Sequence, residues 1–279
     1  MIRCNETDEE VRGFDDKSSR VELVSNNLAR QILWKHDYKP ITLLNYSTKL
    51  FSGSLSHLNP GTDYGTDDIL HIDDIPAKDP LNFKENKPFN NFVGFYSIDY
   101  KSHQFRDNEI NVMLMKLKPD WFYTEERYYR LLRRGKANRY RLQGLLSKEK
   151  QTDFFFFIKR TTNRYNKDIE PNCLINAYLI PAISLKRLIM DNLNVIRENH
   201  GLSSLKLEEN DKDKSFKIYQ TLNIYREIKA KVRRNYKFRL FSMEDNGFGQ
   251  DSLMMKIPEE HLLKYIKFNE KGDIIEKKP

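Results

Sequence analysis

Apolar residues recur at helical spacing near the start of the chain. The stripe follows Ser18 and Ser19, which are favourable residues at a helix start, and it ends before Pro40. The pattern therefore predicts an amphipathic helix that ends at about Lys35. Its apolar face carries Val21, Val24, Leu28 and Ile32.

Short apolar and aromatic runs farther along the chain are typical of strands, because β-branched and aromatic side chains pack well on a pleated surface. They cover residues 41–46, 69–72, 92–100, 109–118, 153–160, 174–180 and 253–257. Further helices are predicted over 123–136, 184–197 and 259–267. Such alternation predicts an α/β fold in which helices flank a mixed central sheet.

The chain divides into three parts by composition. Residues 1–17 are polar without a period, which predicts a flexible arm, and residues 18–204 contain the α/β core. Residues 203–217 are charged and poor in apolar side chains, so they predict a linker and a boundary near 205. Residues 205–279 are then expected to form a smaller C-terminal extension.

Composition excludes several classes of protein. The chain has 279 residues, of which 39% are hydrophobic and 32% charged, and no apolar run approaches the roughly 20 residues that span a bilayer. The N-terminal residues lack the apolar centre of a signal peptide, so we expect a cytoplasmic protein without a membrane partner. Neither Cys4 nor Cys173 has metal-ligand spacing to another Cys or His, which argues against zinc but leaves a carboxylate site for a hard cation open.

Positive charge is concentrated in two segments. The formal net charge is +8, and thirteen Lys and Arg lie between Arg127 and Lys167 against two acids. Seven more lie between Arg226 and Arg239 against one acid. Together with the tyrosines between their basic residues, these segments predict a surface that binds DNA phosphates, because each neutralised phosphate releases counterions. The alternative is that each segment forms a solvated helix face. Within the basic segment 123–167, the candidate contacts are Arg127, Arg130, Arg133, Arg134, Lys136, Arg139 and Arg141.

Asp99 and Lys101 are the first candidates for catalysis. Side chains alternate along a strand, so both are expected on one face, about 7 Å apart along the chain. A carboxylate and an ammonium so placed can reach one metal-bound water. The alternative is an exposed ion pair.

Asp68 precedes an apolar strand and is expected to converge with Asp99. Two carboxylates from adjacent strands suit a hard, octahedral Mg²⁺, which keeps its other positions for water and phosphate oxygens. Asp63 and Asp67 remain alternatives for the upstream ligand, and all of these acids could instead be turn residues. Such a site forms only if the carboxylates face the same side of the sheet.

These features resemble the PD-(D/E)xK nuclease superfamily, which includes most type II restriction endonucleases. The resemblance rests on an acid in the first helix (Glu22), a strand opening with Asp68 in GTDDILHI, and Asp99 with Lys101 in YSIDYKSH. It covers about residues 18–195, although no proline directly precedes Asp68.

The resemblance implies a restriction-endonuclease-like core and a Mg²⁺-dependent endonuclease acting on double-stranded DNA. Asp68 and Asp99 would hold the ion, Lys101 would orient or deprotonate the water, and Glu22 would complete the catalytic set. A homodimer would suit a double-strand cutter, because its two-fold symmetry matches the antiparallel strands. The alternative function is a non-catalytic DNA- or RNA-binding accessory protein.

Overall fold

The structure is a computed structural model. It describes residues 2–3, 17–42, 67–90, 93–103, 108–116, 144–148, 150–161, 172–235, 241–245 and 252–275. The chain forms two compact units that interleave along the sequence. Unit 1 comprises residues 1–108, 151–183 and 259–279, and unit 2 comprises residues 109–150 and 184–258.

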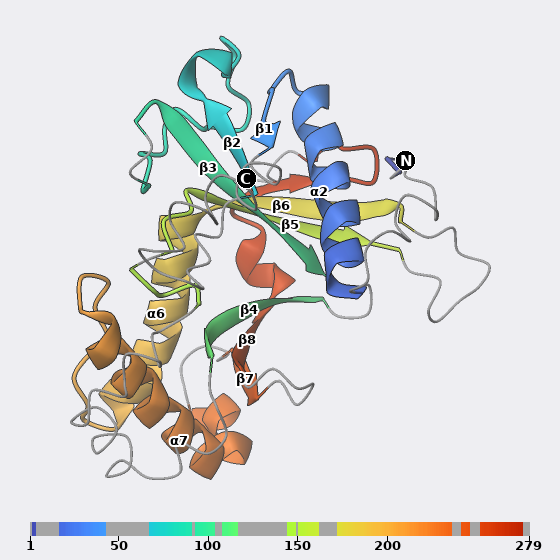
Figure 1. Ribbon diagram of the computed structural model, residues 1–279. Helices are drawn as coiled ribbons and strands as arrows, with labels where there is room; N and C mark the ends of the chain where they lie inside the picture. The colour runs from blue at the N-terminus through green and yellow to red at the C-terminus, as the bar shows by residue number, and fades with distance from the viewer. Residues whose placement is uncertain are drawn as a thin grey trace. The chain divides into compact units, whose positions relative to one another are not determined.

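A mixed sheet organises unit 1 (Figure 1). In the described part of the chain its strand order is β1-β2-β3-β5-β6-β9-β10, in which β3 and β5 are parallel and the other pairs are antiparallel. The strands are β1 (Ile41–Thr42), β2 (Asp68–His71), β3 (Phe95–His103), β5 (Phe154–Arg160), β6 (Leu174–Pro181), β9 (Ile266–Phe268) and β10 (Ile274–Ile275). The predicted α/β fold with a mixed sheet and flanking helices is confirmed.

Helix α2 (Lys17–Lys35) packs across one face of this sheet (Figure 1). Its apolar stripe, which includes Leu28 and Ile32, lies in the main core with Ile98 and Tyr100 of β3. Strand β5 is buried along its whole length, because it lies in the middle of the sheet. A sequence of four consecutive phenylalanines fits this position, since both faces of the strand are covered.

Unit 2 has a separate antiparallel sheet with the order β4-β8-β7. Its elements are β4 (Glu109–Lys116), β7 (Ser242–Asp245), β8 (Ser252–Pro258), helix α7 (Asp211–Asn235) and most of helix α6 (Ala182–Asn199). Buried Arg197 near the end of α6 donates to the backbone carbonyls of Ser203 and Lys217, at 2.6 Å each. These bonds hold the connection between α6 and α7.

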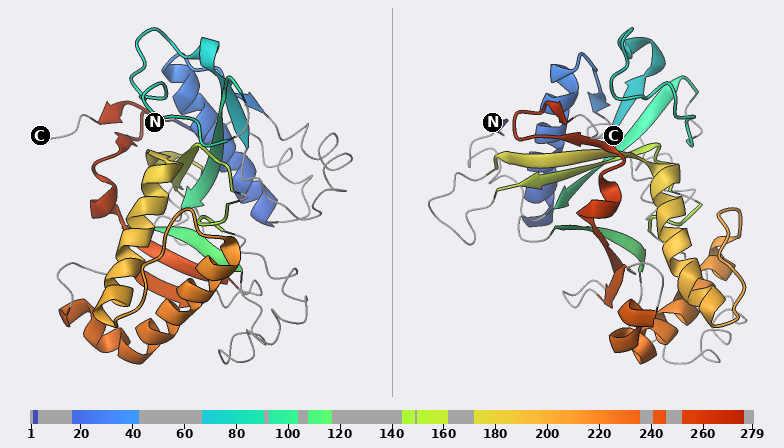
Figure 2. Two further views of the ribbon diagram at one scale, coloured as in Figure 1. Left: turned by 90° about the vertical axis from the view of Figure 1, so that its left-hand side faces the viewer. Right: turned by 180° about the vertical axis from the view of Figure 1, so that it is seen from behind.

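Several predictions about the C-terminal third need correction. The expected boundary near 205 does not match the two units, because residues 259–279 return to unit 1, where β9 pairs with β6 and β10 pairs with β9 (Figure 2). The helix predicted over 259–267 is wrong: this stretch contains a 3₁₀ turn, η5 (Glu259–Leu262), and then β9. The predicted linker 203–217 already contains the start of α7.

Two other predictions concern parts of the chain that are only partly described. The predicted arm is attached at Ile2, whose N–H donates to the carbonyl of Glu270 and whose carbonyl accepts from Leu174. The helix predicted over 123–136 lies outside the described residues.

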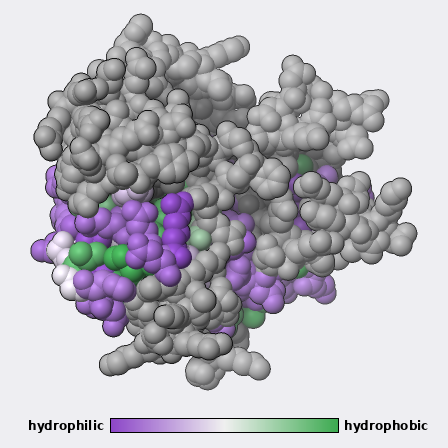
Figure 3. All heavy atoms as spheres, turned by 90° about the horizontal axis from the view of Figure 1, so that it is seen from below, coloured by the Kyte–Doolittle hydropathy of each residue, from purple (hydrophilic) through white to green (hydrophobic). Residues whose placement is uncertain are grey.

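Hydrophilic residues predominate among the described residues on the face shown in Figure 3. In the described part of the chain, no helix has the length and apolar character needed to cross a membrane.

Candidate functional site

Asp99 and Lys101 point to the face of the unit 1 sheet opposite α2. Ile98 and Tyr100 belong to the core beneath α2, so alternation along β3 directs Asp99 and Lys101 to the other side. Lys101 Nζ lies 2.6 Å from Asp99 Oδ1. The prediction that these two side chains share a face is confirmed.

The surroundings of this ion pair differ for its two members. Asp99 and Lys101 pair across the sheet with Phe155 and Phe157 of β5, which are both buried. The Asp99 side chain is 2% exposed, whereas that of Lys101 is 40% exposed. The negative charge of the buried carboxylate is compensated by the ammonium, and the ammonium is the member of the pair that a ligand can reach.

Asp68 faces the other way. It opens β2 opposite Ile98, and its carboxylate accepts hydrogen bonds from Arg30 of α2, Nε to Oδ2 at 2.7 Å and Nη2 to Oδ1 at 2.8 Å. The Tyr100 hydroxyl donates to Oδ2 at 2.8 Å. This buried network lies on the α2 side of the sheet.

The charges of this network reinforce each other. Burial and the negative charge of Asp68 raise the pKa of Tyr100 well above its ordinary value, so the hydroxyl stays protonated and donates. Burial alone would lower the pKa of Arg30, but the hydrogen bond and charge of Asp68 raise it above its usual value. Asp68 therefore has the bonding expected of a structural carboxylate.

The predicted pairing of Asp68 with Asp99 around one Mg²⁺ is corrected by this geometry. The two carboxylates leave the sheet on opposite faces, and a bidentate guanidinium and a hydroxyl already bind Asp68. A single ion cannot be held by both through the sheet.

Asp67, the neighbouring alternative, is close to Asp99. The backbone N–H of Tyr100, which belongs to the peptide between Asp99 and Tyr100, donates to Asp67 Oδ2 at 2.6 Å. The N–H of Asp67 in turn donates to the carbonyl of Ile98 at 2.9 Å. These two bonds hold the Asp67 carboxylate beside the strand segment that carries Asp99 and Lys101.

The side chains of the remaining candidates from the sequence lie outside the described part of the structure. Glu22 lies within α2, but its side chain is outside the described part of the structure. Asp63 and the seven candidate DNA contacts, Arg127, Arg130, Arg133, Arg134, Lys136, Arg139 and Arg141, also lie outside the described residues. In the part that is described, no three His, Cys, Asp or Glu side chains cluster as metal ligands.

Sequence reasoning missed a second charged group on the face of Asp99. Lys159 Nζ lies 2.8 Å from Glu259 Oε1, and the Tyr178 hydroxyl donates to Glu259 Oε2 at 3.1 Å. Alternation from Phe155 and Phe157 would have placed Lys159 on this face. Nothing in the sequence indicated Glu259, which is 100 residues away from Lys159.

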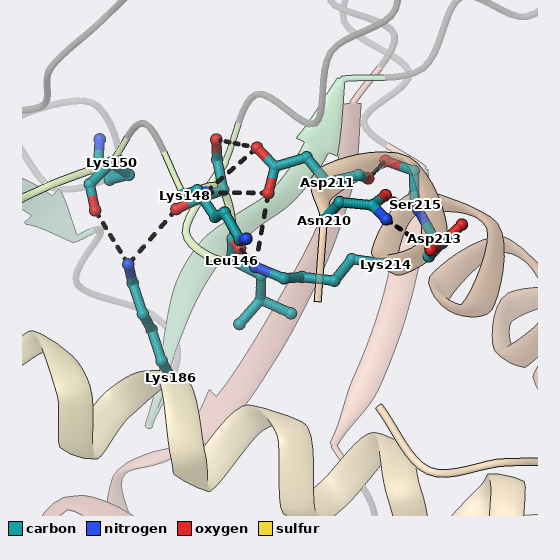
Figure 4. A network of polar contacts seen from close by, with 10 residues as sticks. Leu146, Lys148, Lys150, Lys186, Asn210, Asp211, Asp213, Lys214 and Ser215 are labelled. Carbon is teal, nitrogen blue, oxygen red and sulfur yellow. Dashed lines mark hydrogen bonds and ion pairs between the residues drawn. The ribbon is translucent and has the colours of Figure 1, made fainter. Parts of the chain in front are cut away.

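Unit 2 contains another missed cluster, built around two buried lysines (Figure 4). Lys186 donates to the carbonyl of Lys150 at 2.9 Å, and Lys214 donates to the carbonyl of Leu146 at 2.9 Å. Asp211 accepts from the hydroxyl of Ser147 at 2.8 Å. The cluster joins the turn around residues 146–150 to α6 and α7.

Comparison of the chain with models of known protein families, with curated proteins and with solved structures gave no match.

Proposed function

We propose that this protein is a Mg²⁺-dependent endonuclease that hydrolyses phosphodiester bonds in double-stranded DNA. One observation carries the proposal: Asp99 and Lys101 form an ion pair on one sheet face, and the Asp67 carboxylate is hydrogen-bonded to the adjoining peptide. Asp67 thus takes the upstream role that the sequence first suggested for Asp68.

The order of elements supports the PD-(D/E)xK resemblance as part of this proposal. Among the described elements helix α2 comes first, β2 begins at Asp68 directly after Asp67, and β3 carries Asp99-x-Lys101. Strands β5 and β6 and helix α6 then follow in the expected order. The resemblance would place an acid from the start of β2 at a common site with Asp99. Asp68 faces α2, so we take its neighbour Asp67, whose carboxylate accepts from the N–H of Tyr100, as the candidate.

The donor set fits Mg²⁺. This ion takes oxygen ligands, and proteins hold it through one or two carboxylates while water and substrate phosphate complete its octahedron. When bound, Mg²⁺ lowers the pKa of a coordinated water and offsets the charge that develops on the phosphate.

Three residues of the chain would have the other roles in the reaction. Asp67 and Asp99 would hold the ion, and the exposed ammonium of Lys101 would donate a hydrogen bond that orients the attacking water. As the resemblance implies, the products carry a 5′-phosphate and a 3′-hydroxyl.

The choice of DNA as the substrate follows from the charge distribution. The basic segment 123–167 would contact DNA phosphates, and a homodimer would present two sites to the two antiparallel strands. We place this activity in the cytoplasm.

Plasmid cleavage in Mg²⁺ and in EDTA tests the proposal. The wild type is expected to cut only with Mg²⁺, and Asp67→Asn, Asp99→Asn and Lys101→Met are each expected to reduce the rate by at least about 100-fold. The matched control is Lys35→Met, which breaks a comparable Lys–Asp ion pair, 2.6 Å from Asp273, and should cut normally.

Two results would count against this function. Full cleavage by Asp99→Asn or Lys101→Met would refute the site assignment. Salt-sensitive retardation of DNA by the wild type, without any Mg²⁺-dependent cleavage, would identify a non-catalytic DNA- or RNA-binding accessory protein instead.

A further inference from the structure

Lys159 lies on the same sheet face as the proposed catalytic residues. It pairs with His103 on β3 and with Asn176 on β6, and alternation along β5 gives it the orientation of Phe155 and Phe157. Because Lys101 pairs with Phe157, the Cα atoms of Lys101 and Lys159 are roughly 8 Å apart on adjacent strands. This is on the order of the spacing between successive phosphates of a DNA strand.

The Lys159 ammonium is held in a fixed position. Glu259 Oε1 lies 2.8 Å from its Nζ, and the Tyr178 hydroxyl holds the second oxygen of that carboxylate at 3.1 Å. Glu259 is itself fixed by its N–H, which donates to the carbonyl of Asn108 at 2.8 Å. Burial and the negative charge of Glu259 raise the pKa of Tyr178, which keeps the hydroxyl protonated as a donor.

Stability alone gives little reason for charges at this position. The side chains of Lys159 and Glu259 are 8% and 14% exposed, so both charges have lost much of their hydration. Buried ion pairs are often no more stabilising than well-packed apolar side chains, and the neighbouring positions on β5 are phenylalanines. A preorganised cation, however, has a direct use beside a site that handles phosphates.

A third lysine extends the same face. Lys267 of β9 pairs with Tyr178, and its Nζ lies 5.3 Å from the centre of the Tyr178 ring. Register therefore aligns Lys101, Phe157, Tyr178 and Lys267 in one row across four strands, with Lys159 beside it.

We propose that Lys159 binds the phosphate next to the scissile one, with Glu259 as the positioning residue that holds its ammonium. This inference rests on the proposed function and narrows its substrate to a polynucleotide strand with a second phosphate, as opposed to an isolated phosphodiester. Lys101 acts on the water that attacks the scissile phosphate, and Lys159 binds the neighbouring phosphate.

The first test measures the salt dependence of binding to a short DNA duplex in Ca²⁺. Lys159→Met is expected to weaken binding about tenfold, because it loses one charge-assisted contact. It should also lower the slope of log affinity against log salt by about 0.9, the contribution of one phosphate. Glu259→Gln should weaken DNA binding less than Lys159→Met does and leave the slope unchanged, since Lys159 keeps its charge and loses only the carboxylate that positions it.

The second test compares two substrates in Mg²⁺. Lys159→Met should raise KM for duplex DNA and leave the hydrolysis of bis(p-nitrophenyl) phosphate, which has one phosphate, unchanged. The double variant Lys159→Met/Glu259→Gln should behave in the same way. It does not leave the Glu259 carboxylate buried without Lys159, so it replaces the single variant if that variant does not fold. Lys35→Met on the α2 side is the matched control and should match the wild type in both tests.

The outcomes separate this inference from the proposed function. An unchanged salt slope and unchanged KM for DNA in both Lys159 variants overturn the inference and leave the nuclease proposal intact. If the wild type never cleaves DNA, but Lys159→Met lowers the slope of log affinity against log salt by about 0.9, the nuclease proposal is overturned and the phosphate contact of Lys159 is retained. A wild type that does not bind DNA overturns both.

Discussion

Replacing Lys186 with Met tests the energetics of the buried lysine cluster in unit 2. The Lys186 side chain is almost fully buried and donates to the carbonyls of Lys150 and Ser147, at 2.9 and 3.5 Å (Figure 4). Burial, and then the positive charges of Lys214 and Lys150, lower its pKa to about 7, although Asp211 opposes the shift. The unfolded chain keeps the ordinary lysine pKa of about 10.4.

The sign of the pH dependence follows from these two values. Between pH 7 and about pH 10 the folded protein binds fewer protons at Lys186 than the unfolded chain does. The free energy of unfolding therefore rises with pH across this window, and the contribution of Lys186 is least favourable below pH 7. Between pH 7 and pH 9 the rise from this one group is about 2 kcal/mol.

The Met variant removes the titration and keeps most of the apolar stem. The Lys150 carbonyl loses its donor, which costs about 1–3 kcal/mol at every pH. The Ser147 carbonyl loses only a long contact of 3.5 Å, which adds little. At pH 7, removal of a charge penalty of about 4 kcal/mol outweighs this loss, so we expect Lys186→Met to be more stable than the wild type. By pH 9 the advantage should have fallen by about 2 kcal/mol.

Urea unfolding followed by circular dichroism at pH 6, 7, 8 and 9 measures this difference directly. Lys206→Met, at an exposed lysine of the same unit, is the control and should differ from the wild type by a constant amount. A constant difference for Lys186→Met as well would refute the reasoning, because Lys186 would then keep its proton in the folded protein throughout this range.

Three further substitutions test other contacts. Asp68→Asn is expected to lower the unfolding free energy by about 3 kcal/mol, because it weakens the network around Arg30; a thermal denaturation midpoint equal to that of the wild type would contradict the structural role. Arg197→Met should lower it by about 3 kcal/mol, since buried carbonyls lose their donors, and faster amide exchange in α7 is the measurement. Gly144→Ala should destabilise unit 2, because the added Cβ would overlap the carbonyl of Leu114; unchanged urea unfolding would exclude this close approach.

Local patterns predicted most of the elements but could not place all of them. The helical stripe of α2 and the aromatic run of β5 identify these elements without tertiary information, because each pattern repeats at the period of its own element. The stretch 259–267 has helix-like composition, yet it forms η5 and β9, since pairing with β6 supplies the hydrogen bonds of Ile266–Phe268. Tertiary pairing outweighed local preference there.

Within a single strand, the sequence also determined part of the candidate site. Asp99 and Lys101 share a face because side chains in a strand alternate, and this holds whatever the strand pairs with. Whether Asp67 or Asp68 lies on the same sheet face as Asp99 depends on the register between β2 and β3. A register shift of one residue would exchange the two faces. Asp68 pairs with Ile98 and meets Arg30 of α2, which leaves Asp67 beside Asp99.

The chain's own pattern thus determined its class of fold, its central helix and strands, and one pair of neighbouring charges. Only the folded structure decided which acid accompanies that pair and that Glu259 joins Lys159, because both depend on contacts between residues far apart in sequence. Period and composition act over a few residues, whereas register and packing are set by the whole sheet.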